Sequence, residues 1–491
     1  MQLLVNIISL TKTARRSSNM KNYLTAIICF LFCAACYKDK GNYDINMPAT
    51  PVVKDLDSVY NAVVGDSLII TPKVTIEGND SLALEWRISA PESPTGSYNF
   101  TGPSLRILFG LQANLYVARL TVYNKSNGIR YYYSFQIQGV TEFTAGTTVL
   151  SLDNGVTRLS FITPGGELKP NIYETINGHD LPPNPLSLFY MKDQVQGNMA
   201  LGYWIICKNG GVRLNVSSLQ DDPTYPNTLA KNFFATPDSV VVGSIQEGNR
   251  AFLTGIINDK FYAGYTLTWN QAGTYGMFGD YATGNYNLAS SFVSTYINGQ
   301  YSYIAFEKDK QQFVRISGTP YYYGTQYTTT STAAFDPTNV GMSLIHIEQI
   351  NGGDCFAYCK GSDGIVYELK FTVSFTTSPY TFTPVHKRAF IQQDLINDNT
   401  KWQAAINGVL YIASGEKVYR YNPLNQEVRA LETSFSGNTV SMIKLSDNQD
   451  TLIAGAGSSL YYMDISTGKY GTLTKTITGI PGQPIDMAWR P

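Results

Sequence analysis

The chain is poor in the residues that carry most protein chemistry. Its 491 residues include only 3 histidines and 6 cysteines, and only 15% of them are charged, well below the quarter that is usual in globular domains. Lys and Arg together number 36 against 37 for Asp and Glu. The chain therefore lacks the basic footprint of nucleic-acid-binding proteins, and we expect no nucleic-acid partner.

The N-terminal apolar segment is short. Tyr23 to Ala35 is almost wholly apolar, but thirteen residues rise only about 20 Å as a helix, whereas a hydrocarbon core is about 30 Å thick. Met20-Lys21 supplies a positive start, and small residues precede Cys36. These features are typical of a secretory signal peptide, and we expect no permanent transmembrane helix at this point.

The end of that segment reads Cys33-Ala34-Ala35-Cys36 and resembles a bacterial lipobox, with Cys33 in place of the usual leucine. The resemblance implies cleavage before Cys36 and a diacylglycerol on its thiol. We therefore expect a signal peptide over residues 1–35 and a lipidated linker over 36–50. The alternative is a plain signal peptide with chance cysteines. A second apolar stretch, Leu3 to Leu10, suits a signal poorly, so we expect translation to start at Met20.

Three cysteines remain after Cys36: Cys207, Cys355 and Cys359. In a strand, Cys355 and Cys359 would lie about 13 Å apart, beyond the reach of a disulfide. We expect buried, unpaired thiols.

Residues 51–140 show alternating apolar strands without a helical period. The mid-strand Trp86 and the later strand "YVARLTV", Tyr116 to Val122, resemble the polycystic-kidney-disease (PKD) type of immunoglobulin-like sandwich. The letters "GDSL", Gly65 to Leu68, also occur around the nucleophile of GDSL esterases. Here apolar residues continue the strand, and no histidine follows an aspartate at the required spacing, so we expect no esterase site.

A pattern of paired strands around a polar turn then recurs through residues 141–491. Asn-Gly turns flanked by alternating apolar residues favour hairpins, and units of about 50 residues are typical of propeller blades, which bury their faces by stacking in a ring. We expect an all-β fold with a β-propeller, seven-bladed, after the sandwich; the alternatives are a large sandwich or six or eight blades. The units begin at Val149, Trp204, Phe252, Tyr303, Phe356, Leu410 and Leu452.

The order of lipid cysteine, "YKDKGNYD" (Tyr37 to Asp44), PKD-like domain and propeller resembles the PKD-like family lipoproteins. This resemblance implies a location in the cell envelope, anchored to the outer membrane through Cys36, beside uptake systems of the starch-utilisation type. It transfers no settled activity.

One strand combines a histidine with a carboxylate. In "SLIHIEQI", alternation places Leu344, His346 and Glu348 on one face. The pair could serve as a base and its orienting carboxylate, as two metal ligands, or as an ordinary polar pair. No third metal ligand is visible in the sequence, and ordinary polar pairs across strands are common. We therefore expect no catalytic residue, metal or cofactor.

Aromatic residues in loops are the predicted ligand site. The segment Thr268 to Asn287 is long, glycine-rich and almost uncharged, and binding residues are usually carried by such loops on rigid scaffolds. A competing interpretation packs these rings in the third blade or on sheet surface. The predicted residues are Trp269, Tyr275 and Tyr281 in this segment and Tyr321, Tyr322 and Tyr323 in a second one.

These observations favour a non-catalytic surface lipoprotein that binds a glycan or a peptide, or docks on an uptake complex, through the propeller face. The alternative is a propeller hydrolase or lyase acting on polysaccharide. The last residues, "PIDMAWRP", alternate Ile485, Met487 and Trp489. An open propeller would leave two unpaired edges, so we expect this segment to close the ring by pairing with the blade that contains Val149.

Overall fold

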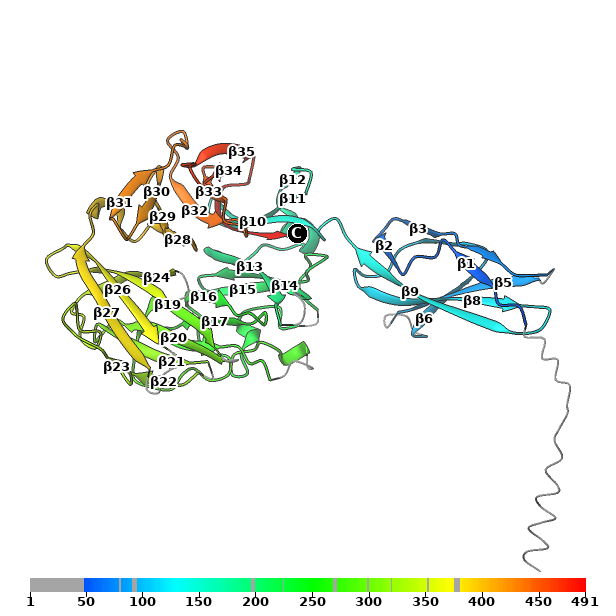
Figure 1. Ribbon diagram of the computed structural model, residues 1–491, viewed down its shortest axis with the longest axis horizontal. Helices are drawn as coiled ribbons and strands as arrows, with labels where there is room; N and C mark the ends of the chain where they lie inside the picture. Colours follow the sequence, from blue (N-terminus) through cyan, green and yellow to red (C-terminus); the bar gives the residue numbers. More distant parts are fainter. Residues whose placement is uncertain are drawn as a thin grey trace, which may run out of the picture.

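The structure is a computed structural model that describes residues 48–491 except 79–80, 91–94, 196–198, 224, 268–271, 298–299, 319, 351–352 and 375–379. The predicted signal peptide, Cys36 and Trp269 lie outside the described residues. The fold is all-β, as expected, with an immunoglobulin-like unit followed by a propeller (Figure 1). Within the described part, no helix has the length and apolar character to span a membrane.

The first unit is a sandwich that packs around Trp86. Its indole is 2% exposed, its Nε1 donates to the carbonyl of Gly102 at 3.0 Å, and its ring meets Phe135 edge-on at 6.1 Å. Ser67 and Leu68 of "GDSL" open a strand that continues to Ile70, as expected. The sheets are β2-β9-β8-β5-β6, β3-β7 and β1-β4, built from β1 (Val52–Lys54), β2 (Val59–Val63), β3 (Ser67–Ile70), β4 (Lys73–Thr75), β5 (Leu82–Ser89), β6 (Ser97–Thr101), β7 (Leu105–Leu108), β8 (Leu115–Asn124) and β9 (Arg130–Val140).

The described strands of the second unit fall into seven sheets. Polar turns close the hairpins: between β10 and β11, Asn154 and Gly155 both have positive φ (48° and 83°), as a tight Asn-Gly hairpin requires. The sheets are β36-β10-β11-β12, β13-β14-β15, β16-β17-β18, β19-β20-β21-β22, β24-β25-β26-β27-β23, β28-β29-β30-β31 and β32-β33-β34-β35.

The elements of this unit have the following bounds: β10 (Gly146–Asp153), β11 (Val156–Ile162), β12 (Leu168–Lys169), α2 (Ile172–Asn177), β13 (Pro185–Asp193), β14 (Met199–Cys207), β15 (Gly210–Leu214), η1 (Ala230–Asn232), β16 (Val242–Glu247), β17 (Leu253–Ile257), β18 (Lys260–Ala263), η2 (Ala272–Thr274), β19 (Leu288–Ile297), β20 (Gln300–Glu307), β21 (Gln312–Ser317), β22 (Tyr322–Gly324), β23 (Thr328–Thr329), β24 (Ser343–Ile350), β25 (Asp354–Lys360), β26 (Val366–Ser374), β27 (Thr381–Ala389), η3 (Gln393–Leu395), β28 (Lys401–Ala404), β29 (Leu410–Ser414), β30 (Lys417–Asn422), β31 (Glu427–Ala430), β32 (Val440–Leu445), β33 (Thr451–Ala456), β34 (Ser459–Asp464), β35 (Thr472–Thr478) and β36 (Gln483–Arg490).

The first strand of each sheet faces a common centre. The inner strands β13, β16, β19, β24, β28, β32 and β36 contact one another in that cyclic order, and β36 contacts β13 (Figure 1). Between neighbouring sheets lie apolar clusters; Trp204 and Ile206 of β14, for example, pack with Leu253 and Ile257 of β17. Each sheet thus buries its faces against its neighbours, as the repeat pattern predicts.

The chain ends of the propeller pair with each other. β36 is antiparallel to β10, with Val149 opposite Met487 and Gly146 opposite Arg490. The predicted closure of the ring by the C-terminal segment is therefore confirmed, and no strand edge of β10 stays open on that side.

A register shift recurs near the start of the inner strands. In β24, Leu344 pairs with Cys359 and His346 with Tyr358, so Ile345 is an extra residue that bulges from the ladder. Leu344 consequently packs in the cluster of Ile347, and it does not share a face with His346 and Glu348, which makes that expectation wrong. Bulges are common beside functional sites because they re-aim side chains. Comparable extra residues are Leu186, Gly243, Ser441 and Ile485.

Candidate functional site

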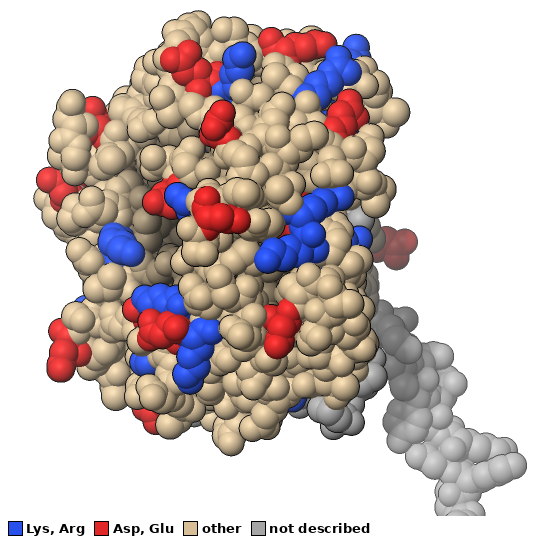
Figure 2. All heavy atoms as spheres, turned by 90° about the vertical axis from the view of Figure 1, so that its left-hand side faces the viewer, with Lys and Arg blue, Asp and Glu red and all other residues tan. Residues whose placement is uncertain are grey.

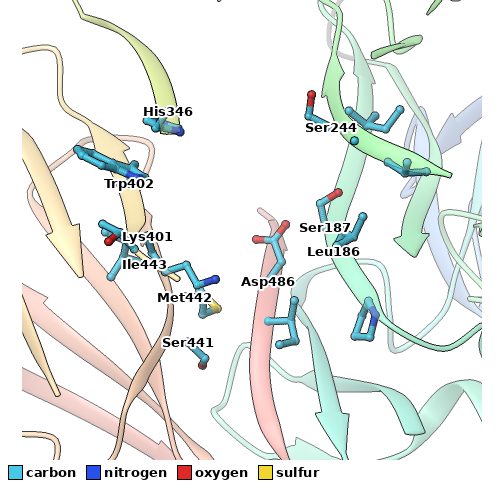
Figure 3. A pocket seen from close by; sticks show the side chains of 16 residues that line it. Leu186, Ser187, Ser244, His346, Lys401, Trp402, Ser441, Met442, Ile443 and Asp486 are labelled. Carbon is cyan, nitrogen blue, oxygen red and sulfur yellow. The ribbon is translucent and has the colours of Figure 1, made fainter. Parts of the chain in front are cut away.

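The bulged ends of the inner strands surround a cavity of about 550 Å³ in the centre of the propeller (Figure 3). A cavity of this size lies within the range of small-molecule sites. Its walls combine aromatic, apolar, hydroxyl and charged side chains, contributed by β13, β16, β24, β28, β32 and β36 and their flanks. The lining residues are Pro185, Leu186, Ser187, Val242, Gly243, Ser244, Ile245, His346, Thr400, Lys401, Trp402, Ser441, Met442, Ile443, Ile485 and Asp486.

Trp402 forms a flat wall of the cavity. Its ring stacks on His346 at 4.8 Å with an interplanar angle of 7°, and on Tyr358 at 4.4 Å. His346 and Tyr358 are directly opposite each other in the ladder, so one indole covers a cross-strand pair. The packing holds Trp402 in one orientation, which suits a rigid platform for a ring-shaped ligand.

His346 is held by its own strand. Its Nε2 lies 2.7 Å from Oε2 of Glu348, and the side chains of this pair are 22% and 24% exposed. Both residues also line a smaller cavity of about 330 Å³, which shares Ser244 and Ile245 with the first one. The two cavities therefore form one elongated recess, and the His346–Glu348 pair lies where they join.

Charged groups occupy two walls of the larger cavity. Asp486 of β36 is fixed, because its Oδ1 accepts from Nζ of Lys444 at 2.8 Å and its Oδ2 from the backbone N–H of Leu188 at 2.8 Å. Lys401 of β28, half-buried, forms no hydrogen bond or ion pair with any described residue. Figure 3 shows Lys401 and Trp402 on one side of the cavity and Asp486 and Ser187 on the other. The Lys401 ammonium is thus available to a ligand.

The predicted aromatic site is divided by the structure. Tyr275 is 5% exposed, and its hydroxyl donates to the carbonyl of Arg250 at 2.6 Å, so its ring belongs to the core. Tyr281 is 40% exposed and also contacts the buried Tyr262 ring edge-on. Ligand binding by Trp269, Tyr275 and Tyr281 stays a prediction. The burial of Tyr275 argues against a ligand contact by that ring.

The second predicted segment packs beside the first. Tyr321 is 60% exposed and forms a parallel bridge with Thr283. Tyr322 stacks at 4.2 Å on the buried Tyr286, and Tyr323 lies under the guanidinium of Arg315 at 4.1 Å. Of this trio, Tyr321 presents the most open ring to solvent. None of these tyrosines lines the central cavity.

Other chemistry-bearing groups are structural. Cys207, Cys355 and Cys359 are buried free thiols, as expected, and burial raises the pKa of each thiol to about 12, which leaves them unreactive at neutral pH. His386 contacts a buried carboxylate: its Nε2 lies 2.9 Å from Oε1 of the fully buried Glu368. Among the described residues, no cluster of three or more His, Cys, Asp or Glu is arranged to hold a metal ion.

The surface carries charge of both signs. Figure 2 shows basic and acidic side chains interspersed on one face, most of which carries neither. This distribution agrees with the near balance of 36 basic and 37 acidic residues.

Fold and cavity together define an all-β protein in which an immunoglobulin-like sandwich precedes a propeller with a ligand-sized central recess. Residues 36–185 match the model of the PKD-like family. This match covers the sandwich and continues through β10, β11 and α2 to the first residue of β13. The resemblance expected from the sequence is thereby confirmed for this part of the chain.

Solved structures resemble the chain at low identity. A quinoprotein alcohol dehydrogenase-like protein from Bacteroides thetaiotaomicron matches over 90% of this chain and 99% of its own, with 11% identity and a TM-score of 0.41. The Dos1 propeller matches over 70% and 88%, with 8% identity and a TM-score of 0.40. Dihydro-heme d1 dehydrogenase NirN matches over 76% and 73%, with 8% identity and a TM-score of 0.39. The comparison with curated proteins gives no match.

Proposed function

We propose that the protein is a non-catalytic, lipid-anchored binding component of a nutrient-uptake system at the outer membrane, with a glycan or peptide fragment held in the central recess of the propeller. The observation that carries the binding role is the cavity of about 550 Å³, in which the fixed Trp402 plane stands beside the unpaired Lys401 and across from Asp486. The lipobox-like sequence before Cys36 supports the anchor.

The mixture of groups suits sugars and peptides. An aromatic plane packs on the apolar face of a sugar ring or on a side chain, while carboxylate, ammonium and hydroxyl groups hydrogen-bond the polar edge. Because Trp402 and Asp486 are already held by protein contacts, little ordering remains to be done on binding, which favours affinity.

A hydrolase or lyase is the second candidate, and the His346–Glu348 contact of 2.7 Å is the observation in its favour. A general base needs a histidine oriented by a carboxylate and open to substrate. Here, however, the imidazole ring is stacked flat against Trp402. We therefore assign the pair to ligand contact and to support of the Trp402 platform.

Substitution of Lys401 by glutamine tests the site. Lys401 makes no polar contact with the described protein, so we expect unchanged melting but about tenfold weaker binding of ligands identified on a glycan and peptide array, the typical cost of losing a charged hydrogen bond. Affinity of each purified variant for those ligands is measured by calorimetry. Lys417→Gln, an exposed lysine of the same sheet, serves as the matched control.

Two further experiments separate the central recess from the aromatic loops as the ligand site, and a binding protein from an enzyme. If Tyr281→Ala or Tyr321→Ala abolishes binding while Lys401→Gln binds normally, the ligand site lies on the aromatic loops instead. A hydrolysis assay on the bound ligands should give no product. Product formation that is lost in His346→Ala would show that the protein is an enzyme.

The anchor has its own test. In a Gram-negative host, the wild-type protein is expected in the outer-membrane fraction, whereas Cys36→Ser should appear in the soluble fraction or with an unprocessed signal, because the lipid-bearing thiol is gone. Membrane fractionation followed by immunoblotting measures the distribution. Cys207→Ser, which changes a buried thiol of the propeller, controls for the loss of a cysteine. Unchanged outer-membrane fractionation of Cys36→Ser would rule out the anchor.

A further inference from the structure

The channel at the centre of the propeller contains a further cavity beyond the recess described above. We call it the second cavity, and the cavity of about 550 Å³ the first cavity. Its volume is about 320 Å³, and its lining residues are Leu188, Phe189, Tyr190, Lys192, Glu247, Lys444, Asp447, Ala488 and Trp489. Four inner strands line both cavities. In each of them, β13, β16, β32 and β36, the residues of the first cavity precede those of the second. The two cavities therefore lie at successive levels along the channel.

An ion pair separates the two levels. Asp486 lines the first cavity and Lys444 the second, and their Oδ1 and Nζ atoms are 2.8 Å apart. Lys444 also donates to the carbonyl of Met487, and Asp486 accepts from Leu188. Each charge is thus compensated at this point, so neither residue is the main attractor for a ligand in the second cavity.

Lys192 of β13 is different. Its Nζ stands 5.5 Å from the centre of the Tyr190 ring, and it forms no close ion pair with a described residue. Its backbone N–H donates to Oε1 of Glu247 at 3.0 Å, so the same wall carries a carboxyl group and an ammonium that interacts with it electrostatically. An ammonium without a close ion pair, beside aromatic rings, is a suitable receptor for a carboxylate.

Burial governs the state of Glu247. It raises the pKa of this carboxyl group to about 7, while the amide of Lys192 and the charges of Lys192 and Lys444 act in the opposite direction. The remaining charged groups nearby are engaged: Asp447 accepts from Nε1 of Trp489 at 2.8 Å, and Arg490 donates to the carbonyl of Val216 at 2.6 Å. Glu247 therefore changes charge near neutrality.

We propose that the second cavity binds a small organic carboxylate with a ring-sized body, its carboxylate on the Lys192 ammonium and its ring between Tyr190 and Trp489. The volume of about 320 Å³ accommodates one such ring. This site does not depend on the ligand of the first cavity.

The direction of the pH dependence follows from Glu247. Above its pKa of about 7 the group is a carboxylate that repels an anionic ligand; below it the group is neutral. The protonated fraction rises about tenfold between pH 8 and pH 6, whereas ordinary carboxylic-acid ligands stay ionised throughout. The affinity should therefore increase by up to about tenfold as the pH falls from 8 to 6.

The test uses two matched pairs of probes, glucuronate with glucose and benzoate with benzyl alcohol, titrated into the purified protein and followed by NMR. We expect both acids to bind at least about tenfold more tightly than their neutral partners at pH 6, a preference that is lost in Lys192→Gln and kept in Lys192→Arg and Lys401→Gln. In Glu247→Gln the affinity should be the same at pH 6 and pH 8.

Three results would overturn the proposal: no binding by either acid, equal binding of acids and neutral partners, or a pH dependence that persists in Glu247→Gln. Because Lys401 lines the first cavity and not the second, a loss of array ligands in Lys401→Gln with intact acid binding separates the two sites. The melting temperature of each variant confirms that the protein is folded.

Discussion

Glu368→Ala is expected to lower the free energy of unfolding of the propeller by about 3–5 kcal/mol, the usual cost of removing one partner from a buried ionic network. The Glu368 carboxylate is fully buried. Its Oε1 accepts from Nε2 of His386 at 2.9 Å and from Nε of Arg388 at 3.0 Å, and its Oε2 from the hydroxyls of Tyr358 and Tyr421 at 3.2 and 2.6 Å. Alanine would leave all four donors without this acceptor.

Urea unfolding followed by tryptophan fluorescence measures the loss. Glu427→Ala, an exposed residue of β31, is the control and should change stability by about 0.5 kcal/mol or less. A loss below about 1 kcal/mol for Glu368→Ala would mean that the network contributes little. Since Trp402 stacks on Tyr358, the same variant should also weaken binding in the central recess.

Removal of Ile485 to Pro491 should destabilise all sheets of the propeller together, with a melting temperature lower by about 10 °C or more. The truncation deletes most of β36, which supplies the buried Met487, the partner of β10 and the carboxylate of the Lys444 ion pair. It also exposes two strand edges.

Differential scanning calorimetry of the truncated and full-length proteins provides the measurement. Deletion of Pro491 alone, an exposed residue outside the strand, should have almost no effect. If the longer truncation melts within about 2 °C of the full-length protein, the pairing of β36 with β10 is not what holds the ring closed.

The all-β class, the sandwich and the repeating sheets could be predicted because they follow from local patterns. Alternation identifies strands, and the Asn154-Gly155 turn identifies a hairpin without any knowledge of distant residues. The pairing of the C-terminal segment with the blade that contains Val149 could also be predicted, since a ring must close and the last apolar segment had no other partner; the register, Val149 opposite Met487, comes from the structure. In these cases sequence neighbours or the chain ends carry the information.

The central recess could not be predicted in this way. Lys401, Trp402 and Asp486 belong to different sheets, and their proximity depends on how separate repeats meet around the axis. Strand alternation also assigns Leu344 to the wrong face of β24, because the bulge at Ile345 turns Leu344 away from the face of His346. Tyrosine burial was equally ambiguous: Tyr275 and Tyr281 occupy similar sequence surroundings, yet only Tyr281 is open to solvent.

The pairing of β10 with β36 also bears on how the protein reaches its native state. Leu150 meets Asp486, a residue almost at the other end of the propeller, and contacts so remote in the chain form slowly because a very long loop must close first. Until synthesis has passed Arg490, the hairpins that have already formed cannot close into a ring. Their unpaired strand edges are then prone to pair with another chain. The interval before the last strand arrives is therefore a period of exposure to aggregation that the equilibrium stability of the closed ring does not shorten.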